Sequence, residues 1–106
     1  MSAGKLITST IIHQLVLEHK LSFEDKLSKW YPDIQNAKKI TIEHLLNHTN
    51  GIFSFQADST YHNSNKYYSP NELIDRSTKL HKNLFKPGKY WSYTNTGYLL
   101  LSLIHI

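Results

Sequence analysis

Two short patterns in the sequence contain residue types that can carry nucleophilic chemistry. Ser2-Ala3-Gly4-Lys5 has the form S-x-x-K, with a hydroxyl and an amine at a spacing that shares one face of a helix. A lysine in a poorly solvated pocket loses its proton readily, so it can accept or relay the serine proton while the serine oxygen attacks a carbonyl. Alone, the pattern fits equally well with an ordinary helix start capped by serine.

The second pattern is Tyr93-Thr94-Asn95, of the form Y-x-N. Its phenol could act as a proton acceptor beside a serine, and its amide could hydrogen-bond a substrate. Tyr61-His62-Asn63 has the same form, so the surroundings must decide between the two.

The element expected to position the serine and the lysine is a helix from Lys5 to His19. Apolar residues recur there at intervals of four, as on one face of a helix. The apolar stripe is wide, which predicts that the helix is covered on most sides and needs a larger body around it.

The rest of the chain predicts further short helices joined by loops. Ser69-Pro70-Asn71-Glu72 is a capping box with proline at the first helical position. Residues 53–68 are polar and aromatic without a period, which predicts a surface loop. Other helices are expected after Ser22 and up to Pro32, from Thr41 to His48, and after Thr96-Gly97. Strands are almost absent from this interpretation.

Three blocks resemble one family, the serine β-lactamases and penicillin-binding proteins, and within it the class C β-lactamases and D-alanyl-D-alanine carboxypeptidases. Residues 2–33, SAGKLITSTIIHQLVLEHKLSFEDKLSKWYPD, resemble the family's nucleophile helix without a gap. Residues 40–52, ITIEHLLNHTNGI, resemble its "ITIRHLLTHTSGL" segment, and residues 85–101, FKPGKYWSYTNTGYLLL, resemble its "F.PG..W.YSN.GY.LL" block. The joint occurrence of the blocks, in this order, selects Ser2 among the serines.

The resemblance implies a serine hydrolase that forms an acyl-enzyme on Ser2 with a peptide, β-lactam or ester carbonyl. Lys5 would assist deprotonation, Tyr93 would act in the acid and base steps, and Asn95 would hold the substrate amide. It also implies an oxyanion hole with one N–H from Ser2 and another from a distant strand. No cofactor or metal is implied, and the expected partner is a small molecule or a peptidoglycan-like peptide.

The implied fold is the α+β β-lactamase/transpeptidase-like fold, of which residues 1–106 would be a mainly α part with four to five helices and long loops. The strands that precede the nucleophile in the family, and its Lys-Thr-Gly-like motif, have no match in the sequence. The chain by itself is therefore expected to be inactive. A rival interpretation is a helical binding or interaction module without enzymatic activity.

Composition and charge disfavour several other classes of function. The formal net charge of +4 comes from scattered basic residues, unlike the concentrated stripe of a nucleic-acid-binding protein. Cysteine is absent, which excludes disulfides and a thiol nucleophile. His44 and His48 have a spacing that can chelate zinc, but no third ligand is evident. No signal peptide or membrane span is recognised, and the family favours the bacterial periplasm or cell exterior.

Overall fold

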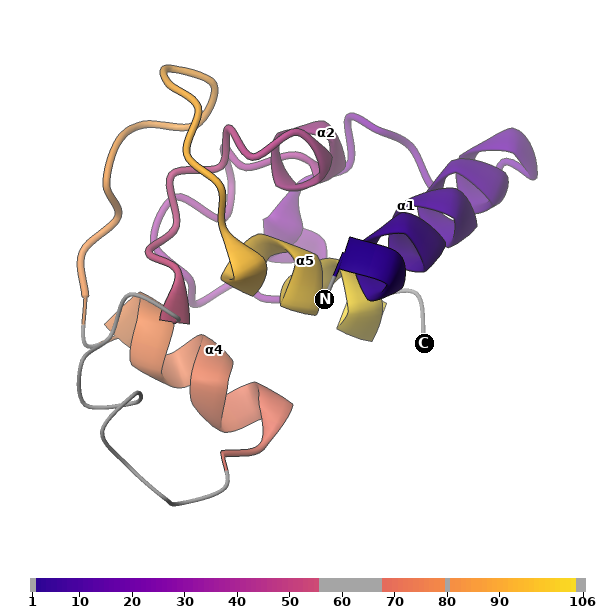
Figure 1. Ribbon diagram of the computed structural model, residues 1–106. Coiled ribbons are helices and arrows are strands. Elements are labelled where there is room, and N and C mark those ends of the chain that lie inside the picture. The colour runs from indigo at the N-terminus through magenta and orange to yellow at the C-terminus, as the bar shows by residue number, and fades with distance from the viewer. Residues whose placement is uncertain (1, 56–67, 80, 105–106) are drawn as a thin grey trace.

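The computed structural model describes residues 2–55, 68–79 and 81–104, and the side chains of residues 2–4 lie outside that description. The described chain is helical and contains no strand, as predicted, although an antiparallel bridge joins Lys26 and Thr41. None of its helices is long and apolar enough to span a membrane. The elements are α1 (Ser2–Leu17), the 3-10 helix η1 (Leu27–Lys29), α2 (Ile42–Leu46), α4 (Pro70–Lys79) and α5 (Asn95–Ile104) (Figure 1).

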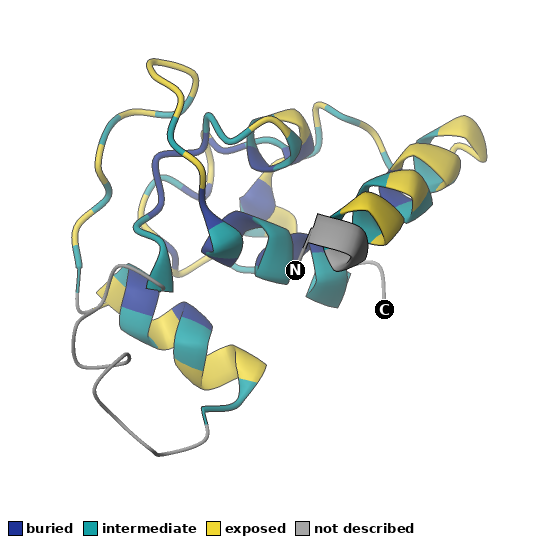
Figure 2. Cartoon of the chain, viewed as in Figure 1, coloured by how far each residue is buried: buried dark blue, intermediate teal, exposed yellow. Residues whose placement is uncertain are grey.

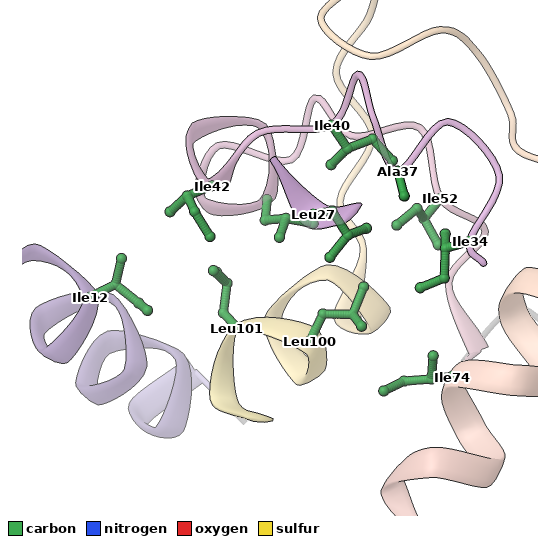
Figure 3. Close-up of a cluster of buried hydrophobic side chains, with 11 residues drawn as sticks. Ile12, Leu27, Ile34, Ala37, Ile40, Ile42, Ile52, Ile74, Leu100 and Leu101 are labelled. Carbon is green, nitrogen blue, oxygen red and sulfur yellow. The ribbon is translucent and has the colours of Figure 1, made fainter. Parts of the chain in front are cut away.

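Helix α5 is the element on which the others converge. It packs against α1, α2 and α4 (Figure 1). Leu100 and Leu101 are fully buried and lie between side chains from the other helices and the 27–52 region (Figure 3). Their buried neighbours in the core are Ile12, Leu27, Ile34, Ala37, Ile40, Ile42, Leu45, Ile52 and Ile74. Because burial of apolar surface is the main favourable term in folding, α5 holds the fold together.

Two helix starts follow from local hydrogen bonding. Ser69 Oγ accepts the Glu72 N–H and Glu72 Oε1 accepts the Ser69 N–H, which confirms the predicted capping box before α4. Thr41 Oγ1 accepts the His44 N–H, while His44 Nδ1 accepts the Thr41 N–H. A histidine thus takes the role in the capping box of α2 that glutamate or glutamine usually has.

The prediction of a helix after Ser22 is only partly correct. Ser22 Oγ accepts the Glu24 N–H, but the turn continues into η1 rather than an α-helix. The reason is pairing with a distant segment: the Leu27 N–H donates to Ile40 O, and the Ile42 N–H donates to Asp25 O. These long-range hydrogen bonds take the backbone groups that a longer helix would need.

The prediction that the first helix is covered on most sides is wrong for this chain. Helix α1 extends from Ser2. Among its described side chains, those of residues 5–17, only Ile12 is fully buried, and the outer face of the helix is exposed (Figure 2). The exposed fractions are 70% for Leu6, 61% for Ile7 and 79% for Leu17. The wide apolar stripe therefore meets α5 and the core on one side and solvent on the other.

The predicted loop at 53–68 falls largely outside the described residues. Residues 56–67 are not described, and the second Y-x-N pattern, Tyr61-His62-Asn63, lies among them. Leu80 also lies outside the described residues.

Candidate functional site

The predicted nucleophile and lysine stand at the start of α1. Ser2 is the first residue of the helix and Lys5 follows one turn later. The Ser2 side chain lies outside the described residues, whereas that of Lys5 is described and half-buried. Lys5 is therefore the residue of this pair whose side-chain contacts are described.

Lys5 contacts both polar residues of the Y-x-N pattern, Tyr93 and Asn95. Its Nζ donates hydrogen bonds to Tyr93 Oη and Asn95 Oδ1, residues that are 88 and 90 positions away in sequence. The same nitrogen lies 4.2 Å from the centroid of the Tyr93 ring. Tyr93 remains 47% exposed, so its phenol is accessible from solvent. Three of the four residues predicted to form the site are thus brought together.

The segment that carries Tyr93 and Asn95 is held on one side by residues 53–55. The Asn95 N–H donates to Ser54 Oγ at 3.3 Å. Fully buried Thr96 accepts the Phe55 N–H and donates its hydroxyl proton to Phe53 O, each at 3.0 Å. These contacts fix the start of α5, where Asn95 is the first residue.

His48 holds the same segment from the other side, a role that sequence analysis did not identify. The Ser92 N–H donates to His48 O at 2.9 Å, and the Thr94 N–H donates to His48 Nδ1 at 3.1 Å. The His48 ring also stacks on that of Tyr93, with centroids 4.6 Å apart. Burial, and then the charge of Lys5, lower the pKa of His48 below its usual 6.5. The only feature of the sequence that pointed to His48 was its position in the turn formed by residues 48–51, HTNG.

That turn needs its asparagine and glycine. Asn50 is fully buried; its Oδ1 accepts the Ile52 N–H at 2.8 Å. Gly51 has φ +81°, and a Cβ there would lie 2.2 Å from Phe85 O. The Leu84 N–H donates to Gly51 O at 2.7 Å. Only glycine fits where the chain comes this close to another backbone in a left-handed conformation.

The histidine pair considered for zinc is engaged elsewhere. His44 Nδ1 accepts the Thr41 N–H, and His48 Nδ1 accepts the Thr94 N–H. Each ring is therefore hydrogen-bonded to a backbone amide. Across the described ranges, no group of three metal-ligating side chains comes together.

The aromatic residues divide into two groups. Trp30, Tyr31 and Tyr98 are partly buried and pack against the core. Tyr90 and Trp91 are 62% and 65% exposed, and the Trp91 ring meets that of His48 edge to face at 5.9 Å. Trp91 therefore stands beside Tyr93 at the rim of the site.

Comparisons of the sequence with known proteins identify the family of this chain. The family model described as Beta-lactamase matches residues 1–105. A penicillin-binding protein of Bacillus subtilis is 33% identical over 90% of this chain and 22% of its own length. The teichoic acid D-alanine hydrolase of Staphylococcus aureus is 28% identical over 97% of this chain and 24% of its own length.

Solved structures of similar proteins have the same fold over most of this chain. The D-stereospecific amidohydrolase from a Streptomyces species superposes with a TM-score of 0.89 at 28% identity, over 96% of this chain and 34% of that one. The chain thus spans about a fifth to a third of the length of the relatives it matches. With the family model covering nearly every residue, this chain belongs to the Beta-lactamase family of serine hydrolases and penicillin-binding proteins.

Proposed function

We propose that this chain supplies the nucleophile and its proton-transfer partners to a serine hydrolase. Ser2 Oγ attacks the carbonyl carbon of the substrate and forms an ester bond, its proton passing through Lys5 or Tyr93 to the leaving group. Water then cleaves the ester and restores the Ser2 hydroxyl. The observation that carries the proposal is the contact of Lys5 with both Tyr93 and Asn95, one helical turn from Ser2.

Asn95 takes the role of substrate holder in this proposal. Its Oδ1 accepts from Lys5, while its backbone N–H is already used by Ser54. The Asn95 Nδ2 group is oriented by that first contact, and an amide N–H₂ is a donor for a substrate carbonyl. Asn95 thereby links the position of the lysine to that of the substrate.

The proposed substrates are peptides, β-lactams or esters with an activated or amide-type carbonyl. The names of two relatives point to D-configured acyl groups, since one is a teichoic acid D-alanine hydrolase and another a D-stereospecific amidohydrolase. A peptidoglycan-like peptide or a small molecule fits this chemistry. The location that we propose with such substrates is the periplasm or the cell exterior.

We further propose that residues 1–106 form one part of a longer domain, in which a sheet covers the outer face of α1. The exposed Leu6, Ile7 and Leu17 support this, because the burial of large apolar side chains is favourable. The sheet would also provide the second oxyanion N–H and a Lys-Thr-Gly-like motif. Without them, the 106-residue chain is expected to be inactive.

The test is covalent labelling of the complete protein with a fluorescent penicillin or an activated ester. The label should appear on the wild-type protein and disappear in Ser2→Ala, while the control Ser28→Ala, in η1, keeps it. Persistent labelling of Ser2→Ala would remove Ser2 from the mechanism. The 106-residue chain alone should remain unlabelled.

A further inference from the structure

His48 follows α2 with a left-handed backbone conformation. Its φ is 63°, in a region where residues other than glycine are uncommon, although histidine is among the more frequent of them. Such a conformation persists when surrounding contacts determine it. Here the contacts are the Ser92 N–H on His48 O and the Thr94 N–H on His48 Nδ1, at 2.9 and 3.1 Å.

These two hydrogen bonds bracket Tyr93. One backbone N–H on each side of Tyr93 donates to the same histidine, and the ring of Tyr93 stacks on the imidazole at an interplanar angle of 25°. His48 also stacks on Tyr98 of α5 at 5.2 Å, and Tyr98 Oη donates to Leu46 O at 2.8 Å. The imidazole thus joins the end of α2, the Tyr93 segment and α5.

The hydrogen bond from Thr94 also specifies the state of the ring. Since Nδ1 accepts an N–H, it carries no proton, and the neutral imidazole must carry its proton on Nε2. A protonated imidazole has an N–H at both positions and cannot accept. Protonation would therefore set the Nδ1–H against the Thr94 N–H and break the contact.

The groups around His48 favour its neutral form. Lys5 approaches from α1 and acts on it through its charge, while the phenols of Tyr93 and Tyr98 face it from the site segment and from α5. Burial and the Lys5 charge both lower the pKa of His48. The neutral ring is thus retained at neutral pH and lost on acidification.

We propose that His48 is a positioning residue: its neutral, Nε2-protonated ring holds the Tyr93–Asn95 segment against Lys5, and its protonation releases that segment. The catalytic consequence rests on the function proposed above, whereas the structural one does not. His48 touches neither the reacting serine nor a substrate in this scheme. It acts through the placement of Tyr93.

Two substitutions at His48 separate its acceptor from its ring. His48→Asn places an amide oxygen near the position of Nδ1, and asparagine tolerates a left-handed backbone. His48→Gln moves the amide one bond farther out, so the acceptor for Thr94 is lost. Matched controls are His19→Asn and His19→Gln, since His19 has the same backbone conformation, with φ 61°, but is exposed.

The first measurement is NMR of the complete protein across pH 5 to 8. It follows the imidazole nitrogens of His48 and the protection of the Thr94 amide, which is its exchange rate relative to the intrinsic rate at each pH. The expected result is an Nε2–H tautomer at neutral pH and a protection of Thr94 that is on the order of tenfold lower once His48 is protonated. His48→Gln should show the lower protection at every pH, the protection in His48→Asn should not change with pH, and the His19 variants should match wild type. An Nδ1–H tautomer, or a Thr94 protection indifferent to the protonation of His48, would overturn the proposal.

The second measurement is the pH profile of covalent labelling in the complete protein. If His48 positions Tyr93, the acid-side fall in labelling rate follows the pKa that NMR gives for His48 and is absent in His48→Asn. A profile unchanged in His48→Asn would overturn the positioning role even if labelling itself is robust. Absence of any labelling, together with the expected tautomer and exchange, would count against the proposed function and leave the contact with Thr94 established.

Discussion

Lys5 is the residue through which the proposed site is connected. It lies one turn after Ser2 and donates to both Tyr93 and Asn95, so its removal leaves those side chains without their shared partner. The charge of the same lysine lowers the pKa of His48, so it also acts on the residue that orients Tyr93. Loss of Lys5 should therefore affect both proton transfer and the order of the site.

We predict that Lys5→Met lowers the rate of acylation in the complete protein by about 100-fold or more, the usual contribution of a positioned acid–base group. The measurement is the rate of covalent labelling at saturating and subsaturating probe. Lys20→Met is the control, because Lys20 is exposed beyond the far end of α1 and pairs with Glu18. Equal rates in the two variants would exclude Lys5 from proton transfer.

At the scale of elements, helix starts were predictable where the decisive interactions are local. The capping box at Ser69 and Glu72 lies within four residues of sequence, and the structure has both of its hydrogen bonds. The segment after Ser22 was predicted only in part, because its backbone makes hydrogen bonds with a distant segment. The Leu27 N–H donates to Ile40 O, and the Ile42 N–H donates to Asp25 O. No local sequence pattern contains these contacts. The contacts of His48 with the Tyr93 segment were missed for the same reason, since its partners Ser92 and Thr94 are distant in sequence.

The cap of α2 predicts a dependence of stability on pH. Burial is the main cause that lowers the pKa of His44 from its usual 6.5, with the Lys26 charge adding to it and Glu43 opposing it. The unfolded chain therefore binds a proton before the folded chain as pH falls. This contribution to stability is complete above pH 6.5 and is lost as pH falls through the lower pKa of the folded state.

We expect His44→Gln to reduce this loss, because glutamine keeps an acceptor for the Thr41 N–H and does not titrate. The measurement is the urea midpoint of unfolding of the complete protein at several pH values between 5 and 7.5. It is compared with wild type and with His13→Gln, which changes an exposed histidine on α1. A His44→Gln midpoint that declines with acid as steeply as that of the wild type would show that the cap is not the titrating element.

Helix α5 gives a prediction that depends on close packing. A Cβ on Gly97 would lie 2.8 Å from Asn50 Nδ2, and Asn50 is fully buried and held by Ile52. Gly97→Ala should therefore lower the free energy of unfolding by about 1–3 kcal/mol, despite the better helix propensity of alanine. Denaturant unfolding of Gly97→Ala, Asn50→Ala and the double variant in the complete protein measures the coupling. Additive effects would mean that the two residues do not contact each other.

At the scale of the whole molecule, the outer face of α1 is the feature that the chain alone leaves unpartnered. The sequence predicted a helix covered on most sides, yet Leu6, Ile7 and Leu17 are exposed. The apolar stripe reflects what would cover α1 in the longer domain we propose. The apolar pattern of α1 indicates how much of the helix is suited to burial. The 106-residue chain contains only some of the residues that could bury it.

This exposure predicts weak folding cooperativity for the 106-residue chain. A small domain buries a modest share of its surface, and here one helix is covered on only one side. Thermal unfolding followed by circular dichroism and by Trp fluorescence should give broad transitions that do not coincide. A single sharp transition seen by both probes would contradict this expectation.

The family and the general location of the site were within reach of the sequence, because three blocks with distinct residue patterns occur in order. The resemblance implied catalytic or substrate-binding roles for Lys5, Tyr93 and Asn95, and those roles remain predictions. The structure shows that Lys5 donates hydrogen bonds to the other two side chains. The supports at Ser54, His48 and Thr96 were not predicted, since each acts through backbone groups that a sequence pattern does not specify.

The central claim, that Ser2 is the acylated residue, is tested most directly by locating the covalent adduct. The complete protein would be incubated with a penicillin, digested, and its peptides analysed by tandem mass spectrometry. We predict an adduct of the mass of the opened penicillin on Ser2, and none on the same peptide from Ser2→Ala. An adduct on another residue of a folded, labelled protein would contradict the account.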